Sequence, residues 1–295
     1  EKSVSKEREI IQQEIGMYQD SPDYRLFFGA LENLYPGTPL ADDIAGTRDS
    51  ISDITIDNLH ENFDLFYHPS QMHLLVIGKF DVDPILQVLK EYDQISQLPS
   101  IKMERFPVEK NEVKLNQSCR MDVATPKLAI GIRGNDDIKE EEKFRYKLML
   151  KLLFSMMFGW TSQRFQSLYE AGKIDNSLTL EVEVEELFHF VILTMDTKEP
   201  VSLSHQFRSA IKQFDKDPDV NQEHLDTIKS EMFGDFLQGL NSLEYSATQF
   251  DYFSDGSTSY DLPKILQSIS LQDIIKLGHK FIDQAEMVDY MIFQK

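Results

Sequence analysis

The sequence predicts an α+β protein in which one type of domain occurs twice, with mostly antiparallel sheets covered by helices. Helical and strand-like apolar patterns alternate along the chain, and residues 54–77 recur in step as residues 269–292. The second copy begins near residue 113. The counterpart of its first 100 or so residues would lie before residue 1, outside this sequence. We therefore expect one complete domain and only the second half of its twin.

Apolar residues three or four positions apart predict helices, and short continuous apolar runs predict strands. In the first copy these patterns predict helices over 4–19, 23–34, 55–67 and 84–92, and a buried strand over 72–77. Pro22 ends the first helix, Thr55 caps the third, and Pro84 stands in a first turn, where proline is tolerated.

The second copy contains more strands. Its patterns predict strands over 113–119, 127–133, 177–184, 187–196 and 288–293. They predict helices over 140–158, 161–170, 202–214, 221–238, 243–254 and 270–281. Gly172 ends the second of these helices. Residues around Pro107 are charged with few apolar side chains, which gives three parts: a half-domain 1–100, a linker 101–112 and a domain 113–295.

Composition excludes several classes of partner. The chain has 50 acidic and 30 basic side chains, a formal net charge of -20, which argues against nucleic acid and against anionic membrane surfaces. No run approaches the 18 or so apolar residues of a membrane span. The single cysteine, Cys119, allows no intrachain disulfide. This predicts a cytoplasmic protein, although some bacterial extracytoplasmic proteins also lack disulfides.

The repeat pairs particular residues. Thr55 matches Ser270 as a helix cap, and apolar positions match as Leu59 with Ile274, Phe66 with Phe281, Met72 with Met287 and Ile77 with Ile292. A shift of 217 places Glu14 opposite Glu231 and Glu7 opposite His224. We expect Glu231 to be an ordinary helix residue and His224 to face solvent.

Glu7 and Glu14 stand on one side of the first predicted helix, about 20° apart around its axis and roughly 10 Å apart along it. Ile10, Ile11 and Tyr18 lie beside them, so the two carboxylates fall within an apolar stripe that normally faces a core. A buried carboxylate needs a cation, a metal ion or a hydrogen-bond network. The alternative is an exposed helix end at which both carboxylates reach water.

Several stretches together resemble the pitrilysin (insulinase) family of zinc peptidases, in particular its bacterial processing-peptidase-like members. They are Glu7-x6-Glu14, Asp43-Ile-Ala-Gly-Thr47, Tyr67-His-Pro-Ser-Gln-Met72 and the following Leu-Leu-Val-Ile-Gly78. The resemblance continues through 154–172 to the C-terminus. It implies a pitrilysin-type fold and a metalloendopeptidase that cleaves peptides inside a two-domain clamshell.

By the same resemblance Glu14 is the third zinc ligand and Glu7 the accessory acid of the catalytic site. The family completes this site with a His-x-x-Glu-His motif, which supplies two histidine ligands and the general base. None of the seven histidines here forms that motif. The resemblance places the motif in a preceding half-domain, so we expect zinc and peptidase activity in the intact protein and neither in this chain alone.

Family members commonly bind substrate through an Arg and a Tyr of the second copy. Here Tyr169 stands at the Arg position and Asp175 near the Tyr position. The resemblance therefore leaves two possibilities: a different mode of substrate binding through Tyr169, Lys173 and Asp175, or a positive charge supplied by Lys173 and Arg164. Arg164 is otherwise expected to form an ion pair.

Two other functions remain open on the sequence. Some family members lack a working zinc site and serve as the non-catalytic partner subunit of a clamshell, and a peptide-binding module without zinc is the other possibility. The expected partners are a peptide substrate and a second chain in a homo- or heterodimer.

Overall fold

The computed structural model describes residues 2–68, 72–91, 107–251 and 256–295. Its described residues fall into two compact units. The first draws on Glu1–Gly16, Ile44–Pro107 and Leu237–Phe250, and the second on Met17–Asp43, Val108–Phe236 and Asp251–Lys295. This division differs from the predicted one into 1–100 and 113–295, and the first half of the predicted linker, 101–106, lies outside the described residues.

The second unit contains a five-stranded sheet in the order β1-β5-β2-β4-β3. Its strands are β1 (Asn116–Met121), β2 (Lys127–Arg133), β3 (Thr179–Val184), β4 (His189–Asp196) and β5 (Glu286–Gln294). All neighbouring strands are antiparallel except β1 and β5. The mostly antiparallel α+β fold is thereby confirmed, and each strand predicted in the second copy is found within a few residues of its expected position.

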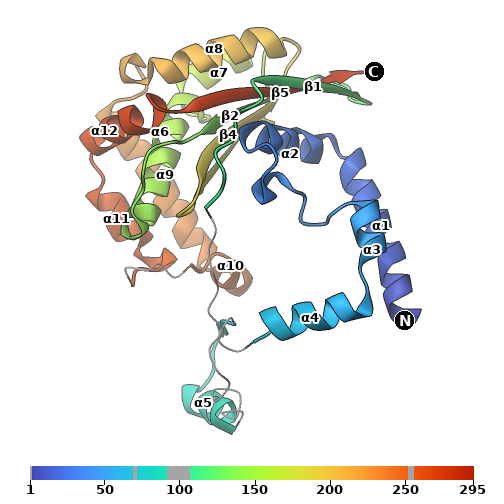
Figure 1. Ribbon diagram of the computed structural model, residues 1–295. Helices are drawn as coiled ribbons and strands as arrows, with labels where there is room; N and C mark the ends of the chain where they lie inside the picture. The colour runs from blue at the N-terminus through green and yellow to red at the C-terminus, as the bar shows by residue number, and fades with distance from the viewer. Residues whose placement is uncertain (1, 69–71, 92–106, 252–255) are drawn as a thin grey trace. The chain divides into compact units, whose positions relative to one another are not determined.

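Both faces of this sheet are covered by helices (Figure 1). Along β2, the side chains of Leu128, Ile130 and Ile132 enter the larger core, while Ala129 faces the smaller one, as the period of two in a strand requires. The larger core is formed with α6 (Lys143–Phe158), α7 (Gln163–Glu170), α8 (Pro200–Lys212), α9 (Gln222–Gly239) and α12 (Leu271–Ile282).

The other face is covered by α2 (Pro22–Leu34), a helix from the predicted first copy. Leu26, Ala30 and Leu34 of this helix are at most 2% exposed. Gly29 permits the close approach, because a Cβ atom there would lie 2.5 Å from the Tyr290 ring on β5. The burial of this apolar helix face explains why the helix belongs to the second unit and not to the unit of its sequence neighbours.

The first unit contains part of α1 (Lys2–Asp20), together with α3 (Arg48–Asp53), α4 (Ile56–Phe66), α5 (Val82–Glu91) and α10 (Leu243–Thr248). Neither α4 nor α5 has a buried residue. The predicted strand over 72–77 is absent, and Leu74 is 68% exposed. A strand needs a neighbouring strand to accept and donate its backbone hydrogen bonds, and no described residue pairs with this segment.

The order of helices nevertheless repeats. The series α1, α2, η1 (Pro39–Ala41), α3, α4 corresponds to α9, α10, η6 (Ser259–Asp261), α11 (Leu262–Ser268), α12. Both α4 and α12 begin with a reciprocal capping box, Thr55 with Asn58 and Ser270 with Asp273. Sequence periodicity missed α3 and α11 because each has at most two turns. Within the described residues, none of the helices combines the length and apolar character of a membrane span.

Candidate functional site

The candidate site is carried by α1, whose packed side differs from the side predicted. Ile15 is 1% exposed, the Gln12 amide donates to Ser52 Oγ at 3.0 Å, and the Arg8 guanidinium donates to the Ile54 carbonyl. These residues lie within about 60° of one another around the helix. The side of α1 that packs in the first unit is therefore the side facing α3.

Glu7 and Glu14 are exposed on an adjacent side of the same helix. The apolar residues beside them are exposed as well: Ile10 to 39%, Met17 to 71% and Tyr18 to 41%. An uncovered strip of carboxylates and large apolar side chains is unusual on a free surface, where single apolar residues are the norm. Neither carboxylate has an ion pair or hydrogen bond with a described residue, so the structure brings no partner to the pair predicted from the sequence.

The second copy shows what its own helix α9 contacts at the matching positions. The Trp160 indole Nε1 donates to Glu231 at 2.7 Å, and His224 Nε2 lies 2.8 Å from Thr161 Oγ1. His224 is half-buried, and its Nδ1 lies 3.0 Å from the Asp219 carbonyl, so the expectation that it faces solvent is wrong. Both α9 side chains thus contact the two residues that follow Gly159, the C-cap of α6.

The predicted substrate residues lie on and after α7. Tyr169 is 46% exposed and stacks on Phe165 with ring centroids 5.8 Å apart. Lys173 Nζ forms an ion pair with Glu199 at 3.0 Å. Asp175 is exposed and accepts from the Ser177 backbone N–H at 2.9 Å, and hydrogen bonds from Ser177 lower the pKa of its carboxyl. Gly172, with φ +64°, ends the α7 turn as predicted.

Arg164, the alternative source of positive charge, is engaged elsewhere. Its guanidinium pairs with the buried carboxylate of Asp217 and lies 5.6 Å from the centroid of the Phe158 ring. The predicted ion pair is therefore present, although its acidic partner is buried. This arrangement leaves Arg164 less available to a substrate than an unpaired arginine would be.

A buried polar network in the second unit was not found from the sequence. His189 Nε2 lies 2.8 Å from Asp136 Oδ1, and the Tyr146 hydroxyl donates to Asp136 Oδ2 at 2.9 Å. Lys280 Nζ adds an ion pair at 3.3 Å. Burial raises the pKa of Asp136, but the bonds from His189, Tyr146 and Lys280 outweigh it and hold the pKa below 3.8. No local motif indicates this network, because His189 lies 53 positions from Asp136 and Lys280 comes from α12 near the end of the chain.

Among the described residues no three His, Cys, Asp or Glu side chains come together as a metal site. A carboxylate such as Glu14 is a suitable zinc ligand, but a zinc site needs three or four ligands. The chemistry of α1 therefore fits one contribution to a metal site whose other ligands come from elsewhere.

Comparison with known proteins identifies a family. Residues 53–232 match the family model of the peptidase M16 inactive domain. The chain is 35% identical over 279 residues to the uncharacterized zinc protease YmfH of Bacillus subtilis, covering 93% of this chain and 65% of that protein. It is 20% identical to an uncharacterized zinc protease of Rickettsia bellii, covering 97% of this chain and 69% of that one. The chain thus spans about two thirds of the length of these two curated relatives.

Solved structures show the same fold. An M16-like peptidase from Alicyclobacillus acidocaldarius superposes with a TM-score of 0.84 at 22% identity, over 100% of this chain and 71% of that one. A protease from Helicobacter pylori superposes with a TM-score of 0.79 at 17% identity, over 99% and 72%. At these identities the likeness supports the fold alone.

Proposed function

Because the chain belongs to the peptidase M16 family, we propose that the intact protein is a zinc-dependent metalloendopeptidase cleaving peptides enclosed between two related domains. In this proposal Glu14 is a metal ligand and Glu7 an acid beside it. The resemblance to pitrilysin-type zinc peptidases, confirmed by the family match, supplies the reaction class. The observation that carries the proposal is the uncovered strip of α1 on which both carboxylates stand.

The internal repeat indicates which segment the α1 strip with Glu7 and Glu14 would face in the intact protein. In the second copy, the counterparts of Glu14 and Glu7 contact Trp160 and Thr161, which follow the C-cap Gly159 of α6. By analogy Glu14 and Glu7 face the end of the first-copy counterpart of α6. That counterpart falls in the segment that the resemblance implies to precede this chain and to carry His-x-x-Glu-His. The same segment would supply the other ligands that α1 lacks.

The exposed apolar residues of the first unit also support a preceding half-domain that would bury them. Phe66 is 48% exposed, whereas its counterpart Phe281 is fully buried; Met72 is 59% exposed, whereas Met287 is 6% exposed. In the second copy Phe281 contacts the rings of Phe154 on α6 and His189 on β4, and Met287 pairs with Ile132 of β2. We propose that the corresponding elements of the preceding half-domain cover Phe66 and Met72 in the first copy.

The roles of the two carboxylates follow from their chemistry. Glu14 would hold the metal through a carboxylate oxygen, which a neutral amide replaces poorly. Zinc, when bound, would polarise the scissile carbonyl and bring the pKa of a bound water toward neutrality. Glu7 lies two helical turns away on the same side, where an acid can orient a ligand or hold a proton. Tyr169, Lys173 and Asp175 remain proposed contacts to the peptide.

The test compares three glutamates of α1 in the intact protein. Glu14→Gln should lower zinc affinity and peptide cleavage by at least about 100-fold, because loss of a direct ligand should cost no less than the roughly 10–100-fold that loss of an outer-shell partner costs. Glu7→Gln should lower turnover while the zinc content stays near one per chain. Glu9, also exposed but on the opposite side of the helix, is the matched control, and Glu9→Gln should change neither. Retained zinc and cleavage in Glu14→Gln would overturn the proposal.

A non-catalytic role is the second candidate, favoured by the match to the family's inactive domain. In that case the intact protein would serve as a partner subunit in a dimer or as a peptide-binding module. Metal analysis of the purified intact protein separates the two functions, since the non-catalytic role predicts no bound zinc. We retain the cytoplasm as the proposed location, on the strength of the single cysteine.

A further inference from the structure

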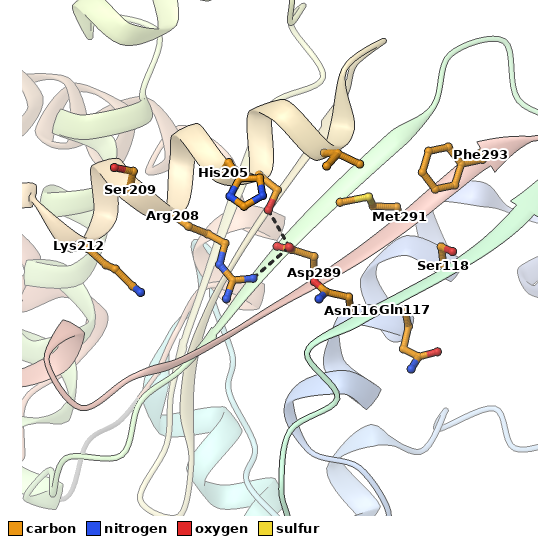
Figure 2. Close-up of a pocket in the computed structure, with 12 residues that line it drawn as sticks. Asn116, Gln117, Ser118, His205, Arg208, Ser209, Lys212, Asp289, Met291 and Phe293 are labelled. Atoms are coloured by element: carbon orange, nitrogen blue, oxygen red, sulfur yellow. Dashed lines mark hydrogen bonds and ion pairs between the residues drawn. The ribbon is translucent and has the colours of Figure 1, made fainter.

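A groove of about 760 Å³ runs along one edge of the sheet in the second unit, between α8 and the strands β1 and β5 (Figure 2). One wall is the β1 stretch from Asn116 to Ser118. The other wall is α8, from Val201 to Lys212, and the floor is formed by side chains of β5. The groove shares no residue with the Glu7 and Glu14 strip.

The backbone of β1 is available along the outside of this groove. Asp289 N–H donates to the Leu115 carbonyl, and Lys295 N–H donates to the Met121 carbonyl. Because the bonds of a parallel ladder alternate along a strand, the odd-numbered residues of β1 bond to β5. Asn116, Ser118 and Arg120 therefore direct their N–H and C=O groups outward, and no described strand pairs with that side. An open edge of this kind accepts an extended peptide as an added strand.

The α8 wall of the groove is basic. His205, Arg208 and Lys212 lie three or four positions apart and form one stripe of the helix, and Figure 2 shows the Arg208 and Lys212 side chains extending into the groove. The charge of Arg208 is partly neutralised by Asp289, because Arg208 Nη1 lies 3.0 Å from Asp289 Oδ2. Lys212 is exposed and forms no ion pair with a described residue. A basic stripe is distinctive in a chain whose net charge is -20.

The floor provides one further polar site among apolar neighbours. Asp289 is 5% exposed, and its Oδ2 accepts from Ser204 Oγ at 2.7 Å. Its Oδ1 is buried without a hydrogen-bond donor among the described residues. Met291 and Phe293 continue the floor toward the end of the sheet. The groove therefore combines a hydrogen-bonding edge, a positive wall and a partly apolar floor.

We propose that this groove binds an extended acidic peptide, which pairs with β1 as a sixth strand and directs a carboxylate toward Lys212. Alternate side chains of an added strand point to the same face of a sheet, so every second residue enters the groove. An Asp or Glu at these positions complements Lys212 and His205, and smaller apolar residues contact Met291 and Phe293. The proposal concerns binding alone and does not depend on zinc or on peptide cleavage.

The probe is a fluorescein-labelled octapeptide, Thr-Glu-Thr-Val-Thr-Glu-Thr-Val, in which glutamate and valine share one face of the strand. The same peptide with lysine in place of glutamate is the comparison. Fluorescence anisotropy is measured on the intact protein in the presence of a metal chelator, so that cleavage cannot remove the probe. We expect the acidic peptide to bind at least about tenfold more tightly than the basic one, and the difference to shrink at high salt. Equal binding of the two peptides would overturn the proposal.

Two substitutions test the two walls separately. Lys212→Gln should weaken binding of the acidic peptide about fivefold, the effect of one exposed ion pair. Lys198→Gln is the control, because Lys198 is exposed, unpaired among the described residues and outside the groove. Equal effects of the two would contradict the charge assignment.

Ser118→Pro removes an outward N–H and should weaken binding about tenfold, whereas Ser118→Thr should not. The thermal unfolding midpoint of each variant shows whether it folds. If Ser118→Pro does not fold, the comparison of Lys212→Gln with Lys198→Gln still tests the proposal. Unchanged binding by a folded Ser118→Pro would exclude strand addition. Competition by a short oligonucleotide as effective as that by the unlabelled peptide would show a general polyanion site and also overturn the proposal.

Discussion

Residues at matching positions of the repeat have different surroundings. Glu231 and His224 contact the residues that follow α6, whereas Glu14 and Glu7 have no described partner. The side of a helix on which a carboxylate lies can thus be predicted from the neighbouring sequence. Its role depends on which residues, distant in the sequence, lie against it in the fold. For Glu14 we propose that these residues are a set of metal ligands, whereas for Glu231 the fold supplies the Trp160 indole.

The buried network around Asp136 gives a prediction at the same scale. Asp136→Asn should lower the free energy of unfolding by about 3 kcal/mol at pH 7, because it leaves His189 and Lys280 without their anionic partner. The folded-state pKa of Asp136 lies below 3.8, so its contribution is present above that pH and is lost as the pH falls through the lower folded-state value. Urea unfolding at pH 7 and near pH 3 measures this.

The adjacent Asp137 provides the control for this substitution. It is exposed, and with the described residues it interacts only through its backbone carbonyl, which accepts from Lys280. Asp137→Asn should leave the free energy of unfolding within about 0.5 kcal/mol of the parent. A difference between Asp136→Asn and the parent that stays constant with pH would contradict the role assigned to the ionised carboxylate.

At the scale of elements, α4 and α12 show how one sequence pattern leads to different packing. Both helices begin with a capping box and repeat apolar residues at helical spacing. In α12 those residues fill the larger core, while in α4 Leu59, Phe63 and Phe66 are each about half exposed. Local sequence therefore specifies the helix and its apolar side, and the presence of a sheet decides whether that side is buried.

The repeat offers a matched pair of truncations. Phe281→Ala should lower the free energy of unfolding by about 4 kcal/mol, because it empties a fully buried position. Phe66→Ala in the 295-residue chain should change it by less than about 1 kcal/mol. In the intact protein, the proposed cover predicts that Phe66→Ala becomes costly as well. Denaturant unfolding of each variant and its parent tests this, and a small effect of Phe66→Ala in both contexts would contradict the proposed cover.

At the scale of the whole molecule, the two compact units differ in how many apolar residues they bury. The second has a sheet with helices on both faces, whereas the buried apolar residues of the first unit are few, among them Ile15 and Ile51. Regions with few buried apolar contacts open locally at low free energy. We therefore expect backbone amides of α4 and α5 in the 295-residue chain to exchange with deuterium much faster than those of β2, β4 and β5. Equal protection of the two sets would show that the first unit has a core of its own.

The sequence by itself determined the α+β class, the duplication pattern, most element positions and the shared side of Glu7 and Glu14, because these depend on spacing along the chain. The tertiary structure alone decided that α2 covers the sheet of the second unit, that 72–77 forms no strand and that Asp136 is joined to His189. These features depend on which surfaces meet, and residues more than 50 positions apart carry no local signal of their contact. The groove beside β1 belongs to the same group, since its walls come from 116–118, 201–212 and 289–293 and meet only when the sheet is assembled.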